Sequence, residues 1–157
     1  MPGETRKRNG HSDKLTQMKD KLFLDTNVVV DLLGEREPFY DSIARIATLA
    51  DRGSIRIVVS SLTYPIVYFL LEKYEKKELV REKIRKFRVI TETSDLTDGI
   101  IDKGLASGFS DFEDALQYFC AVDAGCTVFI TRNGKDFKLS ELPVLTPDEY
   151  LGSLTNT

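Results

Sequence analysis

The sequence has no apolar stretch that approaches the ~20 residues a helix needs to cross a bilayer. Its first twenty residues are polar and lack the apolar core of a secretory signal. We therefore expect a protein that works in the cytoplasm and has no membrane partner.

Cysteine and histidine are also scarce. The two cysteines, Cys120 and Cys126, are too few for a disulfide framework, and we expect buried free thiols. The one histidine, His11, lies in the polar leader, so the domain lacks the usual general base and the commonest transition-metal ligand. Chemistry in this chain must then run on carboxylates, which favours Mg²⁺ or Mn²⁺ over zinc or copper.

A large excess of basic residues is absent too. The net charge of -3 gives no overall positive field, which tells against an avid, nonspecific nucleic-acid binder. Any contact with nucleic acid must come from local patches. Residues 75–86 are densely charged with both signs, and they form either a solvated helix face or a contact surface for RNA phosphate.

What is present is an alternation of short apolar runs with longer helical stretches, which is typical of βαβ units and a mainly parallel sheet. We expect a flexible polar leader over 1–20, one folded α/β domain over 21–152 and a short tail over 153–157.

The pattern also predicts the boundaries of the elements. We expect strands at 21–25, 55–60, 87–90, 127–131 and 144–145. We expect helices from 26 to before Gly34, at 40–51, from 61 or 63 to about 76, at 95–107, from 110 to 124, and from 146 onward. A Ser-x-x-Glu capping box, Ser110 to Glu113, is predicted to begin the helix that ends at Ala124.

Asp25 follows the first apolar run directly, where the chain turns into a helix. Asp25, Thr26 and Asn27 are all good N-caps, but a cap needs one such residue and not three. An aspartate at the end of a buried strand also costs desolvation unless it is paired or liganded. We therefore expect Asp25 to be functional, with Thr26 and Asn27 in supporting roles.

Two more acidic segments lie beside expected strand ends or helix starts. Asp114 sits one turn into a helix that does not need it as a cap, and Asp136 lies in a polar turn after the fourth strand. Open α/β sheets bind ligands at the carboxyl edge, so Asp25, Asp114 and Asp136 can share one site there. Asp111 is a further candidate, although first-turn charge is the stronger explanation for it.

Several carboxylates brought together repel one another, and a divalent cation removes that conflict. Magnesium held by two or three carboxylates keeps water ligands, and it can orient water for attack on a phosphodiester. Arg132 and Lys135 could hold flanking phosphates, with surface solvation as the alternative.

These residues give the chain a resemblance to PIN domains, the fold of the VapC-like toxin nucleases of bacterial toxin–antitoxin pairs. The resemblance spans about 21–150. It rests on the segments FLDTNVVVDLL, SSLT, DFEDALQYFCAVDAGC, VFITRNGKDF and PVLTPDEY in that order, and REPFY is similar to one PIN subgroup.

The resemblance implies a three-layer α/β/α sandwich with a mainly parallel twisted sheet and a Mg²⁺- or Mn²⁺-dependent endoribonuclease site. It assigns metal-binding, catalytic roles to Asp25 and Asp114. It leaves Asn133 and Asp136 as candidates for the last acidic position, with Asp136 preferred.

One family position departs from the pattern. The glutamate usual in the helix after SSLT falls near Ile66, where there is no acid. Asp31 or Asp111 could replace it.

Three functions follow as hypotheses. The first is a metal-dependent ribonuclease, a toxin that acts on RNA, is restrained by an antitoxin protein and forms a homodimer. The second is a degenerate PIN module that binds RNA or protein without catalysis. The third is another magnesium enzyme, such as a phosphatase, although Asn27 stands where the Asp-x-Asp motif of phosphatases needs its second aspartate.

Overall fold

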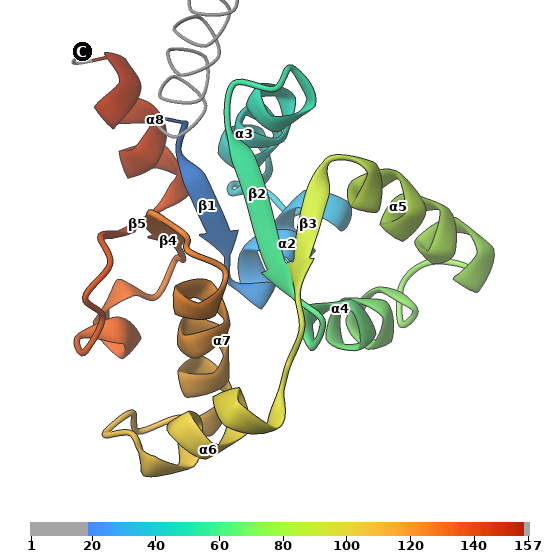
Figure 1. The fold of residues 1–157 in the computed structure, drawn as a ribbon. Helices are drawn as coiled ribbons and strands as arrows, with labels where there is room; N and C mark the ends of the chain where they lie inside the picture. The colour runs from blue at the N-terminus through green and yellow to red at the C-terminus, as the bar shows by residue number, and fades with distance from the viewer. Residues whose placement is uncertain (1–18, 156–157) are drawn as a thin grey trace, which may run out of the picture.

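A computed structural model describes residues 19–155. Five strands form one sheet in the order β3-β2-β1-β4-β5, and every neighbouring pair is parallel (Figure 1). The strands are β1 (Lys21–Leu24), β2 (Arg56–Ser60), β3 (Thr91–Ser94), β4 (Val128–Ile130) and β5 (Val144–Leu145).

Within residues 19–155, seven α-helices and one short 3₁₀ helix connect or follow these strands. They are α2 (Thr26–Leu33), α3 (Tyr40–Asp51), α4 (Thr63–Leu71), α5 (Lys77–Val89), α6 (Asp98–Ala106), α7 (Phe112–Asp123), the 3₁₀ helix η1 (Gly134–Phe137) and α8 (Pro147–Thr155). The expected α/β/α sandwich with a parallel sheet is confirmed.

The alternation of side chains along β1 divides the core into two layers. Leu22 and Leu24 pack with α2, α3, α4, α5 and α8 on one face of the sheet, and Phe23 packs with α6 and α7 on the other. Figure 1 shows α7 in front of the sheet and α2 and α3 behind it. Successive strand residues point to opposite faces, so a central strand covered on both sides reads as a continuous apolar run.

Two predicted elements near the charged segment were wrong. Residues 87–90 are not a strand, because α5 continues to Val89 and buries Val80 and Phe87 two turns apart. The third strand is Thr91–Ser94 instead, at the edge of the sheet and with no apolar side chain to reveal it. Helix α4 also ends at Leu71, earlier than expected.

The predicted capping box was wrong as well. Asp111, not Ser110, is the N-cap of α7, and its carboxylate accepts a hydrogen bond from the Asp114 amide at 2.9 Å. At the other end Gly125 has φ +70°, the left-handed conformation that commonly ends a helix and that glycine adopts without strain.

The two ends of the chain can be compared with the predicted domain boundaries. Most of the predicted leader, residues 1–18, lies outside the described residues. Helix α8 continues to Thr155, past the boundary placed at 152. Within residues 19–155, no helix is both long enough and apolar enough to span a membrane.

The Phe129 ring links the sheet to η1. It is fully buried, with ring centroids 5.3 Å from Phe23 and 4.4 Å from Phe137. We expect Phe129→Ala to lower the free energy of unfolding by about 3–5 kcal/mol because it leaves a cavity in a packed core. Urea unfolding followed by circular dichroism measures this change.

Phe69→Ala is the matched control, since Phe69 is 56% exposed. It should cost under about 1 kcal/mol. Equal losses in the two variants would contradict the assignment of Phe129 to the core.

Candidate active site

Asp25 is buried at the carboxyl end of β1 and caps α2. Its two carboxylate oxygens each accept one hydrogen bond of 2.8 Å, one from the Thr26 amide and one from the Thr131 hydroxyl. Thr131 follows β4, the neighbouring strand, so the end of one strand holds the carboxylate at the end of the next. Both oxygens retain lone pairs for a further partner.

Asp25, Asp114 and Asp136 act on one another electrostatically. Burial raises the pKa of Asp25, the hydrogen bonds from Thr131 and Thr26 and the charge of Arg132 lower it, and the charge of Asp136 raises it. Burial also raises the pKa of Asp114 to about 7, with further increases from Asp111, Asp25, Asp136 and Glu113. The structure thus brings the three predicted acids into mutual electrostatic range.

The three acids do not form a ready-made set of direct metal ligands. Among residues 19–155, no three Asp, Glu, His or Cys side chains converge closely enough to hold an ion together. Asp136 is exposed on η1 and Asp114 is half-buried on α7. A magnesium ion still fits this donor set, because it binds through one or two carboxylates and keeps several waters. Burial is the largest cause of the raised pKa of Asp114, and the neighbouring carboxylates raise it further, a repulsion that a cation would relieve.

Asp31 lies elsewhere, in a buried ion-pair cluster. Its carboxylate is 2.7 Å from Arg132 Nε and 3.3 Å from Arg36 Nε. The Arg132 guanidinium carbon in turn lies 3.9 Å from the centre of the Phe39 ring. Asp31 was a candidate to replace the acid that is missing near Ile66, but its carboxylate is already paired with two arginines. Arg132 points toward Asp31 rather than into solvent.

The remaining predicted residues divide by depth. Thr26 is buried, Asn27 and Lys135 are exposed, and Asn133 is half-buried. The Asn133 backbone amide donates to the Thr131 hydroxyl at 3.0 Å. Thr131, which bonds Asp25, therefore links Asn133 to that carboxylate. Asp111 is exposed and caps α7, as described above.

Sequence reasoning missed a polar network behind Asp25. The Thr26 hydroxyl lies 3.1 Å from the Thr63 hydroxyl and accepts a hydrogen bond from Gln117 Nε2 at 3.0 Å. All three residues are buried, and Gln117 Oε1 has no hydrogen-bond partner among the described residues. The available signal was a glutamine inside the otherwise apolar stretch Ala115–Cys120.

Glu113 is another residue near the site for which the sequence indicated mainly a capping role. The charge of Asp25 contributes to raising its pKa, after burial and Asp111. Because Asp111 caps α7, Glu113 is free of the capping role that the sequence suggested. Helix α4 supplies no acid at all.

The pKa of Asp114 predicts a pH-dependent stability. The folded value of about 7 exceeds the ordinary 3.8, so the folded state binds the proton more tightly. Stability therefore falls as the pH rises through this window. We expect Asp114→Asn to be more stable than wild type above pH 7, by about 1 kcal/mol after solvent screening. Thermal melts between pH 4 and 8 test this, and the gain should vanish near pH 4.

The Asp31 cluster predicts a loss of stability on neutralisation. Asp31→Asn leaves the charges of Arg36 and Arg132 without their buried partner and should cost about 3 kcal/mol. Urea unfolding measures the loss. Asp123→Asn, at an exposed position, is the control and should stay within about 0.5 kcal/mol of wild type; an equally small effect at Asp31 would contradict the ion-pair role.

The chain is similar in sequence to proteins that are already known. The family model of the PIN domain matches residues 21–135. Ribonuclease VapC1 of Aquifex aeolicus (strain VF5) is 28% identical over 136 residues, which cover 83% of this chain and 93% of the relative.

Two solved structures share the fold. A toxin–antitoxin complex from Klebsiella pneumoniae gives a TM-score of 0.60 at 22% identity over 80% of this chain and 97% of that one. The sarcin–ricin loop cleaving toxin VapC20 of Mycobacterium tuberculosis gives 0.55 at 13% identity over 69% and 86%. With the family match covering most of the described residues, the chain belongs to the PIN domain family.

Proposed function

We propose that this PIN domain is a metal-dependent endoribonuclease that hydrolyses RNA phosphodiesters. The observation that carries the proposal is the electrostatic coupling of Asp25, Asp114 and Asp136 around the carboxyl edge of the sheet. The name of the Aquifex relative, a ribonuclease, supports the same activity.

The cofactor in this proposal is Mg²⁺ or Mn²⁺, which Asp25, Asp114 and Asp136 would bind in part through the water ligands of the ion, with Asp111 beside them. Such an ion supplies a polarised water and stabilises the leaving oxygen. The residues of the chain orient the site: Thr26 and Thr131 fix both oxygens of Asp25. Asn133 and Lys135 provide donors for phosphate oxygens on the exposed side, and Arg132, which is paired with Asp31, offers its remaining N–H groups beside Asp25.

We also propose that the protein is a cytoplasmic toxin, that it forms a homodimer and that an antitoxin protein restrains it. The toxin–antitoxin complex from Klebsiella pneumoniae, which shares the fold, supports such a partner. The Asp31–Arg132 pair gives Asp31 a part in the proposed site without metal ligation, since it fixes an arginine beside Asp25.

The test is cleavage of single-stranded RNA with Mg²⁺ or Mn²⁺ by wild type and by Asp25→Asn. Asparagine also caps a helix, so the fold is retained. We expect the variant to lose activity by at least on the order of 100-fold. Asp123→Asn should cleave like wild type, and excess EDTA should stop cleavage. Equal rates for Asp25→Asn and wild type would overturn the proposal.

A second candidate is a degenerate PIN module that binds RNA without cutting it. The absence of an acid from α4, where the family has a glutamate, favours this reading. Wild-type protein that binds RNA in the presence of Mn²⁺, but leaves it intact, would support this candidate over the first.

A further inference from the structure

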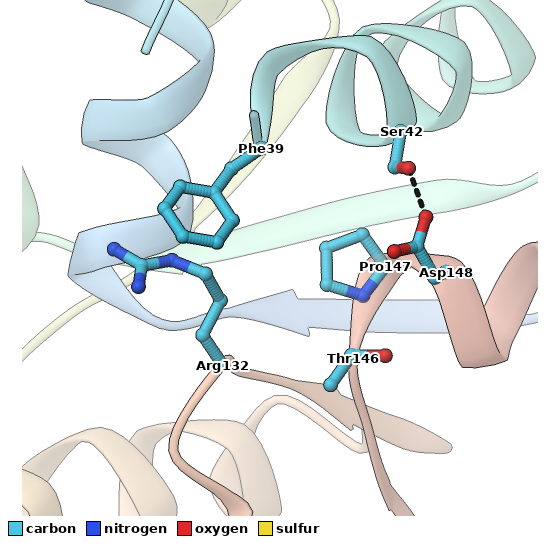
Figure 2. A pocket seen from close by; sticks show the side chains of 6 residues that line it. All are labelled: Phe39, Ser42, Arg132, Thr146, Pro147 and Asp148. Atoms are coloured by element: carbon cyan, nitrogen blue, oxygen red, sulfur yellow. Dashed lines mark hydrogen bonds between the residues drawn. The ribbon is translucent and has the colours of Figure 1, made fainter. Parts of the chain in front are cut away.

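A cavity of about 220 Å³ lies beside the candidate active site. Its lining comes from three segments of the chain. Figure 2 shows Phe39 and Arg132 on one side and Pro147 and Asp148 on the other. Ser42 and Thr146 complete it. Of these six residues, only Arg132 is also a site residue predicted from the sequence.

The sheet connects this cavity to Asp25. The Thr131 hydroxyl donates to Asp25, and the Thr131 amide donates to Leu145 of the neighbouring strand at 3.0 Å. Arg132 and Thr146, the next residue on each side, line the cavity. The cavity therefore lies at the same carboxyl edge as the acids, where open α/β sheets bind ligands.

The size and walls of the cavity suit one flat ring. It is smaller than the roughly 300 Å³ of pockets that enclose drug-sized ligands. The Phe39 ring is 37% exposed and Pro147 is buried, so an aromatic and an apolar ring line it. Bases of single-stranded RNA stack on such side chains whatever their sequence.

Arg132 stands at the boundary between the cavity and the acids. Its guanidinium is held by Asp31 at 2.7 Å and by the face of Phe39, so its position is set before any ligand binds. Its charge also reaches Asp25. A guanidinium fixed there is placed to bind the phosphate that joins a base in the cavity to the phosphodiester at the acids.

Asp148 gives the cavity a chemical preference. One carboxylate oxygen accepts a hydrogen bond from the Ser42 hydroxyl, and Figure 2 shows the other turned toward Pro147. That oxygen accepts no hydrogen bond within residues 19–155. A carboxylate accepts readily from the amino group of cytosine, adenine or guanine. Uracil has a single N–H between two carbonyl oxygens, which the carboxylate repels.

We propose that this cavity binds the base of a nucleotide next to the scissile phosphate, and that Asp148 selects an amino-bearing base over uracil. The inference rests on the proposed ribonuclease function and adds to it a site for sequence preference.

The first experiment measures binding, so that it does not depend on cleavage. Asp25→Asn protein is titrated with fluorescent oligocytidylate and oligouridylate, two pyrimidine probes that stack similarly. We expect oligocytidylate to bind about tenfold more tightly, as one charged hydrogen bond would give. Adding Asp148→Asn should bring the two affinities together. Adding Asp102→Asn instead, at an exposed position on α6, should leave the difference unchanged.

Equal affinities without the Asp148 change, or a preference that survives it, would overturn the subsite. The second experiment maps cleavage of random RNA oligonucleotides by wild type and Asp148→Asn. Uracil should be depleted at one position beside the cut in wild type and restored in the variant. Absence of all cleavage, with the cytosine preference in binding intact, would count against the proposed activity and leave the subsite supported.

Discussion

The fixation of one buried carboxylate by two neighbouring strand ends is the interaction on which the site depends. Asp25 caps α2, and Thr131 at the end of β4 holds it from the side. A hydroxyl that bonds the carboxylate opposes part of the desolvation penalty, so the acid can be both buried and ready for a cation. Any change that moved β4 relative to β1 would move both the carboxylate and its donor.

Behind this carboxylate lies a hydrogen-bond network made of neutral polar side chains. Thr63 at the start of α4 and Gln117 on α7 meet at the Thr26 hydroxyl. The network ties helices on opposite faces of the sheet to the turn that carries Asp25. Its side chains position the site from within, in a region where α4 brings no acid.

How much of the structure the sequence predicts depends on how far apart in the chain the interacting residues are. Leu22–Leu24 and the acid after them were readable, because a strand covered on both faces is apolar throughout and an aspartate at its end is conspicuous. Strand β3 was not, because an edge strand of polar residues carries no such signal. The prediction of Ser110 as the cap was wrong, because either Ser110 or Asp111 can accept the bond and the sequence pattern does not distinguish them.

Long-range pairings were out of reach. Arg132 lies 101 residues from Asp31 in the chain, and nothing local indicates that the sheet order brings them together. The charges of Asp111 and Glu113 around Asp114 were visible in sequence, but their effect on its pKa depends on burial, which only the fold determines.

Strand β5 is two residues long and forms the edge of the sheet. Backbone hydrogen bonds from Phe129 to Pro143 and from Thr131 to Leu145 attach it to β4. Such a short edge opens locally at a lower free energy than the central strands. The wall that carries Thr146 and Pro147 can therefore fluctuate while β1 and Asp25 stay in place, which allows the cavity to adapt its width without disturbing the acids.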